Sequence, residues 1–595
     1  MQVRNTLTII FCVTCSLALL LTASLRLDSI HSAREDLDLV SNVSIENAPP
    51  GLAFATVAMG AFRGIVVDIL WMRADKLKEE GQFFDAKQLA EWITTLQPRF
   101  AAVWDFQAWN MAYNISVAMP ASQWEERWRW VRNGYELLRD KGIPQNPHSI
   151  LLYRSLAWIF QHKIGGVSDE CHKDYKRELA FAMRSILKER TRKSPLSQQD
   201  FLDMVESQQS LVQAMQDPEV ARLVNGLRDA DERFRDNSEL AGNYISLRQV
   251  PERFEADANE VISDFMGTEA LSKFDVFSRT WLLRNKWKMD PAFMYELNEK
   301  YGPIDGSDLN DHLPLNWEHA DAHAIYWAEQ GLKTAGKKGV YSIDEKNTDR
   351  IVFHSLKALF LRGKLIIYPV DDGPPSVFLR PDLTIFDGLN RIWIEKIEKY
   401  EALEKSNPKA VRGGHKNMLE NATLLFYQAG HIKKSGEIYN ELRKRYMRSE
   451  YEDGLLVFVQ KQMREEIKDL EIHDARELLL MSLREAYFQY AVGEDDMAAA
   501  REDWAKQLYD MYVREFGDYA VRRVNLPSFS MARYLAFMDF INDPYYPRTL
   551  QRALMGRIQV ERPDLFDELE KQEQQLQKRI EEEQKKTQPS VSPNY

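Results

Sequence analysis

LWMRADKLKEEGQFFDAKQLAEWITTLQP, residues 70–98, is the stretch that decides the fold. Bulky and small residues recur in it at helical spacing on both sides of Gly81, which predicts two antiparallel helices joined by a tight turn. Ala74 and Ala86 have little bulk, so the two backbones can approach closely, and Gly81 gives the turn its conformational freedom. Pro98 ends the second helix. The register is defined by Leu70, Ala74, Leu77, Gly81, Ala86, Ala90, Ile93 and Pro98.

The same register returns elsewhere, as a repeat protein requires. Residues 416–446 lack only the closing proline, residues 486–505 repeat the small-residue and turn positions, and partial matches begin at Trp104, Tyr153 and Ala320. A generic helical protein that matches by chance is the alternative. The repeated positions are Leu419, Ala422, Thr423, Phe426, Gly430, Ser435, Tyr439 and Leu442 in the first set, and Ala486, Gly493, Ala498 and Ala505 in the second.

With this register the chain resembles the tetratricopeptide (TPR) superfamily. The resemblance implies an α-solenoid with a concave surface that binds other proteins. Residues 62–98 and 323–327 also resemble an uncharacterised family of membrane-anchored bacterial TPR-like proteins, which implies no defined activity. The expected fold class is all-α: a TPR-like α-solenoid with long inserted helices and one N-terminal transmembrane helix.

The N-terminus carries an apolar run from Leu7 to Leu25. A helix of about nineteen residues is roughly 28 Å long, close to the hydrocarbon thickness of a bilayer. A cleaved signal peptide is the alternative, but Thr22-Ala23-Ser24 is a poor cleavage site. We therefore expect an uncleaved single-pass anchor in the bacterial inner (cytoplasmic) membrane. A short N-terminal tail before a large domain favours a body outside the cytoplasm.

A second apolar stretch runs from Leu52 to Met72 and contains Arg63 and Asp68. Both charges would be costly in the middle of a bilayer, so a buried repeat helix is the expectation and a second membrane span the alternative.

The order of segments follows from shifts in composition. Two short apolar runs, 365–368 and 376–379, flank a turn-rich segment and could form one small β-hairpin. The expected segments are a membrane anchor (1–28), a linker (29–50), an N-terminal TPR-like block (51–190), a helical insert (191–300), a half-repeat with an irregular loop or hairpin (301–383), a C-terminal TPR-like block (384–562), and a charged helix with a disordered tail (563–595).

Composition excludes some partners. The formal net charge is -12, so nucleic acid is not an expected partner, because its phosphates need a basic surface. Two of the three cysteines, Cys12 and Cys15, lie in the apolar run, which leaves Cys171 without a disulfide partner in the remainder.

The densest ionisable cluster contains His312, His319, Asp321 and His323. His319 and His323 are four residues apart and would share one helix face, a geometry that can bind Zn²⁺, and His312 or Glu318 could complete the set. Asp321 would point away from that face. Core or surface histidines are the commoner explanation of such a pattern, and no cofactor is expected.

Other motifs are weaker. Gly331 to Lys337 departs from a phosphate loop because Lys338 replaces the required Ser or Thr. Cys171 lies between His162 and His172, which raises a Cys/His catalytic pair as a minor alternative. A Trp- and Arg-rich run could contribute core residues or could bind an acidic partner or headgroups: Trp124, Arg127, Trp128, Arg129, Trp130 and Arg132.

The sequence thus favours a membrane-anchored TPR-like scaffold that binds another, unidentified protein and is not an enzyme. The alternative from another class is a metal-binding protein or metal-dependent hydrolase built on His312, His319 and His323. A third hypothesis is a periplasmic protein that binds a ligand on a Trp-rich face.

Overall fold

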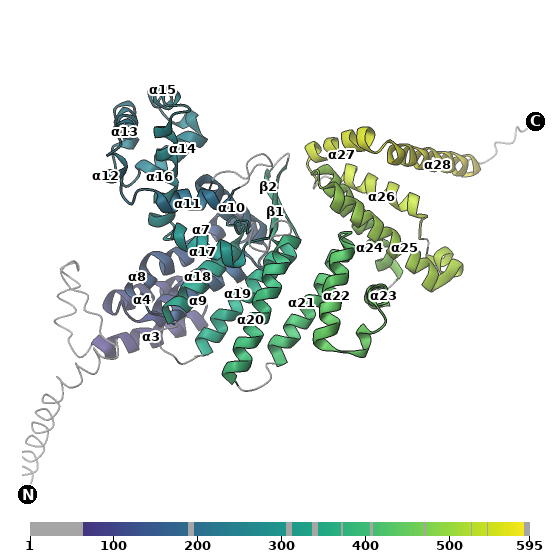
Figure 1. Ribbon diagram of the computed structural model, residues 1–595, viewed down its shortest axis with the longest axis horizontal. Helices are drawn as coiled ribbons and strands as arrows, with labels where there is room; N and C mark the ends of the chain where they lie inside the picture. The colour runs from purple at the N-terminus through teal and green to yellow at the C-terminus, as the bar shows by residue number, and fades with distance from the viewer. Residues whose placement is uncertain are drawn as a thin grey trace, which may run out of the picture. The chain divides into compact units, whose positions relative to one another are not determined.

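The computed structural model describes residues 63–187, 196–304, 312–335, 343–370, 373–404, 409–468, 472–524, 526–543 and 546–587 (Figure 1). The chain divides into two compact units, Met1–Pro98 and Arg99–Tyr595. The described residues form helices and one β-hairpin, which confirms the predicted all-α class. None of these helices is both long enough and apolar enough to cross a bilayer. The predicted anchor and linker, residues 1–50, lie outside the described residues.

The described part of the first unit is a helical hairpin of α3 (Arg63–Glu79) and α4 (Phe83–Leu96). Gly81 lies in the turn with a left-handed φ of +77°. Its amide donates to the carbonyl of Lys78 at 3.1 Å, and the next amide donates to the carbonyl of Leu77 at 2.8 Å. These two bonds satisfy carbonyls that a helix end otherwise leaves free.

Helix α3 presents two apolar faces. Ala74 is fully buried, as is Ala86 on α4, in line with a close helix contact. Ile65, Ile69 and Met72 are 56–64% exposed and lie on the other face. The expectation of a buried helix is therefore wrong for this face, because α4 covers only one side of α3.

Two further helical hairpins belong to the second unit (Figure 1). Their turns match the one at Gly81. Gly430 and Gly493 have φ values of +79° and +83°. In both turns the glycine amide donates to the carbonyl three residues back, and the next amide to the carbonyl five residues back, at 2.9–3.1 Å. The hairpins are α21 (Lys409–Gln428) with α22 (Ile432–Tyr446), and α24 (Ile472–Ala491) with α25 (Asp495–Val524).

Small side chains are buried at matching places in all three of these described hairpins. Seven residues before the glycine stand Ala74, Thr423 and Ala486, and five residues after it stand Ala86, Ser435 and Ala498. Among the other register positions, Leu70 and Pro98 are half-buried, whereas Phe426 and Tyr439 are buried.

Residues 196–301 form mostly short helices, and the expectation of long helices holds there only for Glu269–Asn285, which has 17 residues. Local signals stop them from extending: Asp217 and Asp290 cap helices that begin at Pro218 and Pro291, and Thr268 caps another. The helices are α11 (Gln198–Glu206), α12 (Leu211–Ala214), α13 (Pro218–Ala230), η7 (Glu232–Phe234), α14 (Leu240–Gln249), η8 (Pro251–Arg253), α15 (Ala256–Asp264), α16 (Glu269–Asn285) and α17 (Pro291–Tyr301).

The predicted β-hairpin is confirmed as β1 (Lys364–Val370) and β2 (Gly373–Arg380), paired antiparallel with Leu365 opposite Leu379. The guanidinium of Arg177, in α10 (His172–Ile186), donates to the carbonyl of Pro375 at 3.1 Å, which holds the hairpin against that helix. The helices around it are α18 (Ala320–Ala335), α19 (Ile343–Arg362), η10 (Leu383–Ile385) and α20 (Phe386–Glu404).

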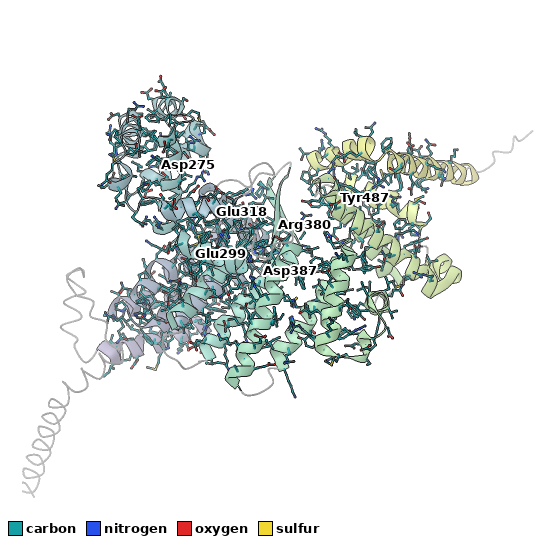
Figure 2. The ribbon with its side chains drawn as sticks, in the orientation of Figure 1. Asp275, Glu299, Glu318, Arg380, Asp387 and Tyr487 are labelled. Atoms are coloured by element: carbon teal, nitrogen blue, oxygen red, sulfur yellow. The ribbon has the colours of Figure 1, made fainter. Side chains whose placement is uncertain are left out.

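Contacts between helices complete the second unit. Asp387 of α20, labelled in Figure 2, pairs with Lys434 of α22 at 2.8 Å. The C-terminal helix α28 buries Leu565 and Leu569. The remaining C-terminal helices are η11 (Ser449–Tyr451), α23 (Leu455–Lys468), α26 (Phe529–Asn542), α27 (Arg548–Glu561) and α28 (Pro563–Thr587).

The start of the second unit departs from regular α-helix. Three described segments are π-helical: η3 (Asn110–Ile115), η5 (Leu138–Gly142) and η6 (Ile159–Ile164). The amide of the residue that follows each segment donates to the carbonyl five residues back. Such segments are rare and are frequently found at functional sites. The elements here are α5 (Ala101–Trp109), η3 (Asn110–Ile115), α6 (Ser116–Ala118), η4 (Ala121–Gln123), α7 (Trp124–Leu137), η5 (Leu138–Gly142), α8 (Ile143–Gln145), α9 (Ile150–Trp158), η6 (Ile159–Ile164) and α10 (His172–Ile186).

Candidate functional site

The three predicted metal ligands are buried and have separate partners. Nδ1 of His312 lies 3.1 Å from the carbonyl of Gly302, and Nε2 of His323 lies 2.9 Å from the carbonyl of Trp317. His319 precedes the first residue of α18, and its Nδ1 accepts the amide N–H of Asp321 at 3.2 Å. His319 therefore lies one residue before α18 rather than on it, and its ring accepts an amide at the helix start.

These histidines do not form a metal site. In the part of the chain that the structure describes, no three His, Cys, Asp or Glu side chains are grouped so that they could hold a metal ion. Burial lowers the pKa of His319 to about 3 and the pKa of His323 to about 4, so both rings are neutral at pH 7. His323 packs on the ring of Phe160, with centroids 5.0 Å apart, as a core aromatic residue does.

Asp321 is fully buried next to these histidines. Its Oδ2 lies 3.4 Å from Nδ1 of His319. Burial raises the pKa of the Asp321 carboxyl to about 7, although Arg362, Ser355 and Lys176 favour the ionised form. Asp321 was expected to point away from both histidines. This expectation is wrong for His319, because the Asp321 carboxylate lies next to its ring.

Lys176 of α10 is the buried cation near Asp321. Its Nζ donates to the carbonyl of Gly166 at 2.6 Å and lies 3.1 Å from Nδ1 of His172. Burial, followed by the positive charge of Arg362, lowers the pKa of Lys176 to about 7. Asp321 and Lys176 thus both titrate near neutral pH, which neither type of side chain does in water.

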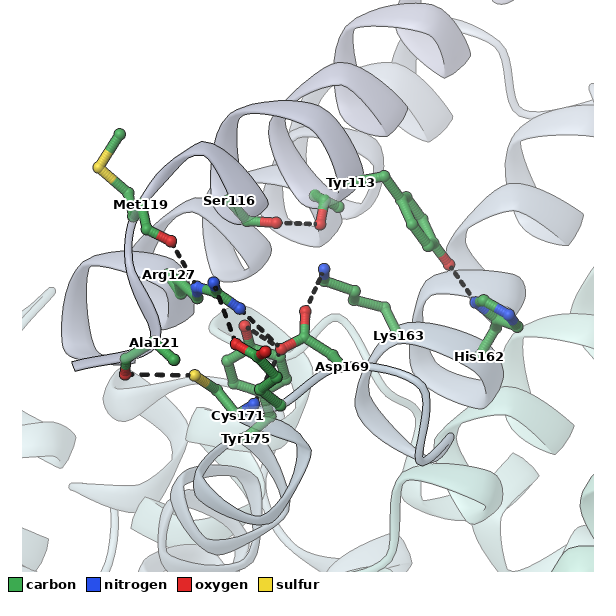
Figure 3. A network of polar contacts seen from close by, with 12 residues as sticks. Tyr113, Ser116, Met119, Ala121, Arg127, His162, Lys163, Asp169, Cys171 and Tyr175 are labelled. Carbon is green, nitrogen blue, oxygen red and sulfur yellow. Dashed lines mark hydrogen bonds and ion pairs between the residues drawn. The ribbon is translucent and has the colours of Figure 1, made fainter. Parts of the chain in front are cut away.

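A second buried network is centred on Asp169 (Figure 3). The Asp169 carboxylate accepts from the guanidinium of Arg127 at 3.3 Å, from Nζ of Lys163 at 2.6 Å and from the hydroxyl of Tyr175 at 3.3 Å. The amide of Cys171 adds a bond of 2.9 Å. Burial disfavours the ionised carboxyl, but Lys163, the Cys171 amide and Arg127 outweigh burial and lower the pKa of Asp169.

The cysteine in this network does not have the environment of a nucleophile. The Cys171 thiol donates to the carbonyl of Ala121 at 3.5 Å, and burial raises its pKa. A nucleophilic cysteine needs the opposite shift. Of the two histidines near Cys171 in sequence, His162 lies 3.4 Å from the hydroxyl of Tyr113, and Nδ1 of His172 lies 3.1 Å from Nζ of Lys176.

The Trp- and Arg-rich run contributes to the core of this region. Trp128 and Arg127 are buried, and Arg127 also donates from Nε to the carbonyl of Met119 at 2.7 Å. Trp124 carries the guanidinium of Arg177 over its ring at 4.5 Å, and Arg129 pairs with Glu126. Arg127 is therefore committed to internal partners and is not available to an acidic partner.

Two hollows lie on either side of an aromatic layer at η3 and η6. One, of about 370 Å³, borders the Asp169 network, and the other, of about 440 Å³, lies between α5, α9 and α19. The layer consists of two stacked pairs, Trp109 on Tyr113 and Trp158 on His162. Several side chains that line this region or are buried near it were not predicted from the sequence. Examples are Lys163, Tyr113 and Lys176. A π segment gives no sequence signal that would have revealed them.

Comparison with known proteins does not add a function to this geometry. No protein-family model matches the chain, and no curated protein matches its sequence.

Proposed function

We propose that the chain is a membrane-anchored, TPR-like scaffold that binds another protein and catalyses no reaction. The observation that carries this proposal is the turn shared by the hairpins at Gly81, Gly430 and Gly493. Small buried residues at fixed distances on both sides of each glycine give the three hairpins one pattern. Repeated helix pairs of this kind commonly present surfaces that bind proteins.

The exposed face of α3 and α4 is our candidate for the protein-binding surface. Ile65, Ile69 and Met72 follow the i, i+4, i+7 spacing of a single helix face, and Phe84 and Trp92 on α4 are also more than half exposed. Contiguous apolar side chains exposed on a soluble surface often mark interaction sites. An apolar helix of the partner would cover them.

The anchor remains part of the proposal. Residues 7–25 would span the bacterial inner membrane once, with the body outside the cytoplasm. Membranes from cells that express the full chain should retain it at pH 11, and a chain that begins at residue 29 should be released. A C-terminal alkaline phosphatase fusion should be active, and a C-terminal green fluorescent protein exported by the same route should be dark. The reverse pair of results would place the body in the cytoplasm.

Site-specific photocrosslinking in intact cells tests the scaffold function. A photoreactive amino acid at position 69 or 92 should capture one protein partner in stoichiometric yield. The same group at position 260, an exposed position on α15, is the matched control and should not capture it. Replacing Ile69 and Met72 together by Glu should abolish capture at position 92 without changing the helical circular dichroism. Equal capture at all three positions, or none, would contradict the proposal.

The structure gives no support to the metal-dependent alternative, because His312, His319 and His323 are engaged with separate partners.

A further inference from the structure

The hollow between α5, α9 and α19 is built from a specific mixture of side chains. Two tryptophans and a set of planar polar groups face one space of about 440 Å³, within the range of small-molecule sites. Its lining residues are Asp105, Trp109, Arg154, Ser155, Trp158, Gln161, Asn347, Arg350, Ile351 and His354. We refer to it as the Trp109–Trp158 hollow.

The two indoles are supported in the same way. Trp109 ends α5 and stacks on Tyr113 of η3, with centroids 4.0 Å apart and an interplanar angle of 17°. Trp158 ends α9 and stacks on His162 of η6, at 4.9 Å and 8°. The contact of 3.4 Å between the Tyr113 hydroxyl and Nδ1 of His162 ties the two pairs together. Each indole therefore has one face held by another ring, and Trp109 is still 42% exposed.

Some polar groups of the lining are held by protein partners. Arg154 is paired with Asp344, and the Gln161 amide donates to the carbonyl of Ile351 and the hydroxyl of Ser355, both at 2.8 Å. The pairing with Asp344 offsets the charge of Arg154, which leaves less attraction for a phosphate.

Other polar groups can still bind a ligand. Arg350 is exposed and donates to Oδ1 of Asn347 at 3.3 Å. Burial raises the pKa of Asp105, against the effects of Ser155 and Arg154, because the carboxyl is partly shielded from water. Burial, Lys357 and Arg350 lower the pKa of His354, which makes its ring a neutral donor and acceptor at pH 7.

We propose that the Trp109–Trp158 hollow binds a saccharide. A pyranose ring has an apolar C–H face that packs on an indole, and hydroxyl groups that each donate and accept hydrogen bonds. Carboxylate, amide, guanidinium and neutral imidazole groups supply both halves of those bonds. A nucleotide fits less well, because Asp105 repels phosphate and the chain as a whole carries a formal charge of -12. This inference is independent of the proposed protein-binding function, which uses α3 and α4.

A glycan array probed with the labelled full-length protein in lipid nanodiscs tests the proposal. At least one class of oligosaccharide should be retained, and titration calorimetry with that oligosaccharide should give saturable binding. Trp109→Ala should weaken binding at least tenfold and Asp105→Asn several-fold. Phe181→Ala removes an aromatic residue of α10 that is 39% exposed and does not line the hollow, and binding should be unchanged. Thermal unfolding should show that Trp109→Ala remains folded, and Trp109→Phe should recover part of the affinity.

Three results would overturn the saccharide proposal. One is an array on which no glycan is retained. Another is binding that Trp109→Ala leaves intact. The third is displacement of the bound oligosaccharide by equimolar ATP or UMP, which would identify the hollow as a nucleotide site.

Discussion

The described parts of residues 101–164 and 409–524 are both mainly helical, but they are built differently. The later segment contains hairpins with left-handed glycine turns and small residues at fixed distances from the turn. The earlier segment interrupts its helices with π turns and lies beside buried charges and two hollows. The regular hairpins therefore set the arrangement of the helices, whereas the irregular helices bring chemically varied side chains together.

The largest expected effect concerns the buried charges of the irregular region. Asp169→Ala leaves Arg127 and Lys163 buried without their shared carboxylate, and we expect a loss of about 3–5 kcal/mol in the free energy of unfolding. Asp387→Ala breaks a half-exposed pair with Lys434 in the regular region and should cost less than about 1 kcal/mol. Chemical denaturation of both variants measures the difference, and equal losses would remove this distinction between the regions.

Buried ionisable groups outside the regular hairpins should also make the stability of the protein depend on pH. Asp321 has a pKa of about 7 in the folded protein and 3.8 as its ordinary value, so its contribution to stability falls as pH rises from about 4 to 7. Asp321→Asn imitates the protonated carboxyl. We expect the variant to match the parent at pH 4 and to be more stable at pH 8, by on the order of 2–4 kcal/mol.

Thermal unfolding of the parent and Asp321→Asn across this pH range is the measurement. The buried histidines have lowered pKa values, so they reduce the stability of both proteins as pH falls below about 6.5. Because both proteins contain them, this effect drops out of the difference in stability between parent and variant. A difference in melting temperature that stays constant between pH 4 and pH 8 would contradict the raised pKa of Asp321.

The turn glycines of the regular hairpins should give an intermediate effect. Gly430→Ala forces a side chain into the left-handed conformation and should cost about 1–2 kcal/mol. Gly436 lies within α22, where an added Cβ meets no atom closer than 3.9 Å, so Gly436→Ala should stabilise by up to about 1 kcal/mol. Denaturation midpoints of the two variants should therefore move in opposite directions. A shift of both midpoints in the same direction would show that the turn is not strained as described.

The smallest effect is expected at Ser435. Its hydroxyl donates to the carbonyl of Thr423 at 2.7 Å, but alanine occupies the matching positions 86 and 498 of the other hairpins. We expect Ser435→Ala to cost less than about 1 kcal/mol, because the shape of the contact is kept. A loss above about 2 kcal/mol would show that the three hairpins are not equivalent at this position.

The sequence predicted the regular region better than the irregular one, for a physical reason. A turn glycine and small residues at a close helix contact are requirements of residue type, and they can be recognised at Gly81, Gly430 and Gly493. Burial of Lys163 and Lys176 is a property of tertiary packing, and a lysine on a helix looks the same in sequence whether it is exposed or buried. His319 was expected on a helix, but it lies one residue before α18, because spacing alone does not show where a helix begins.

The π segments also suggest how this part of the chain would differ in length from a relative that lacks them. A π turn holds one residue more than an α turn, so η3 and η6 are what an α-helix becomes after gaining a single residue. A related chain one residue shorter at either place would have a continuous α-helix. The residues beyond that point would be rotated by about 100° relative to those before it. The side chains beyond η3 or η6 would then meet different neighbours. Gaps of one residue would thus distinguish relatives that have the π segments from relatives with continuous helices at these places.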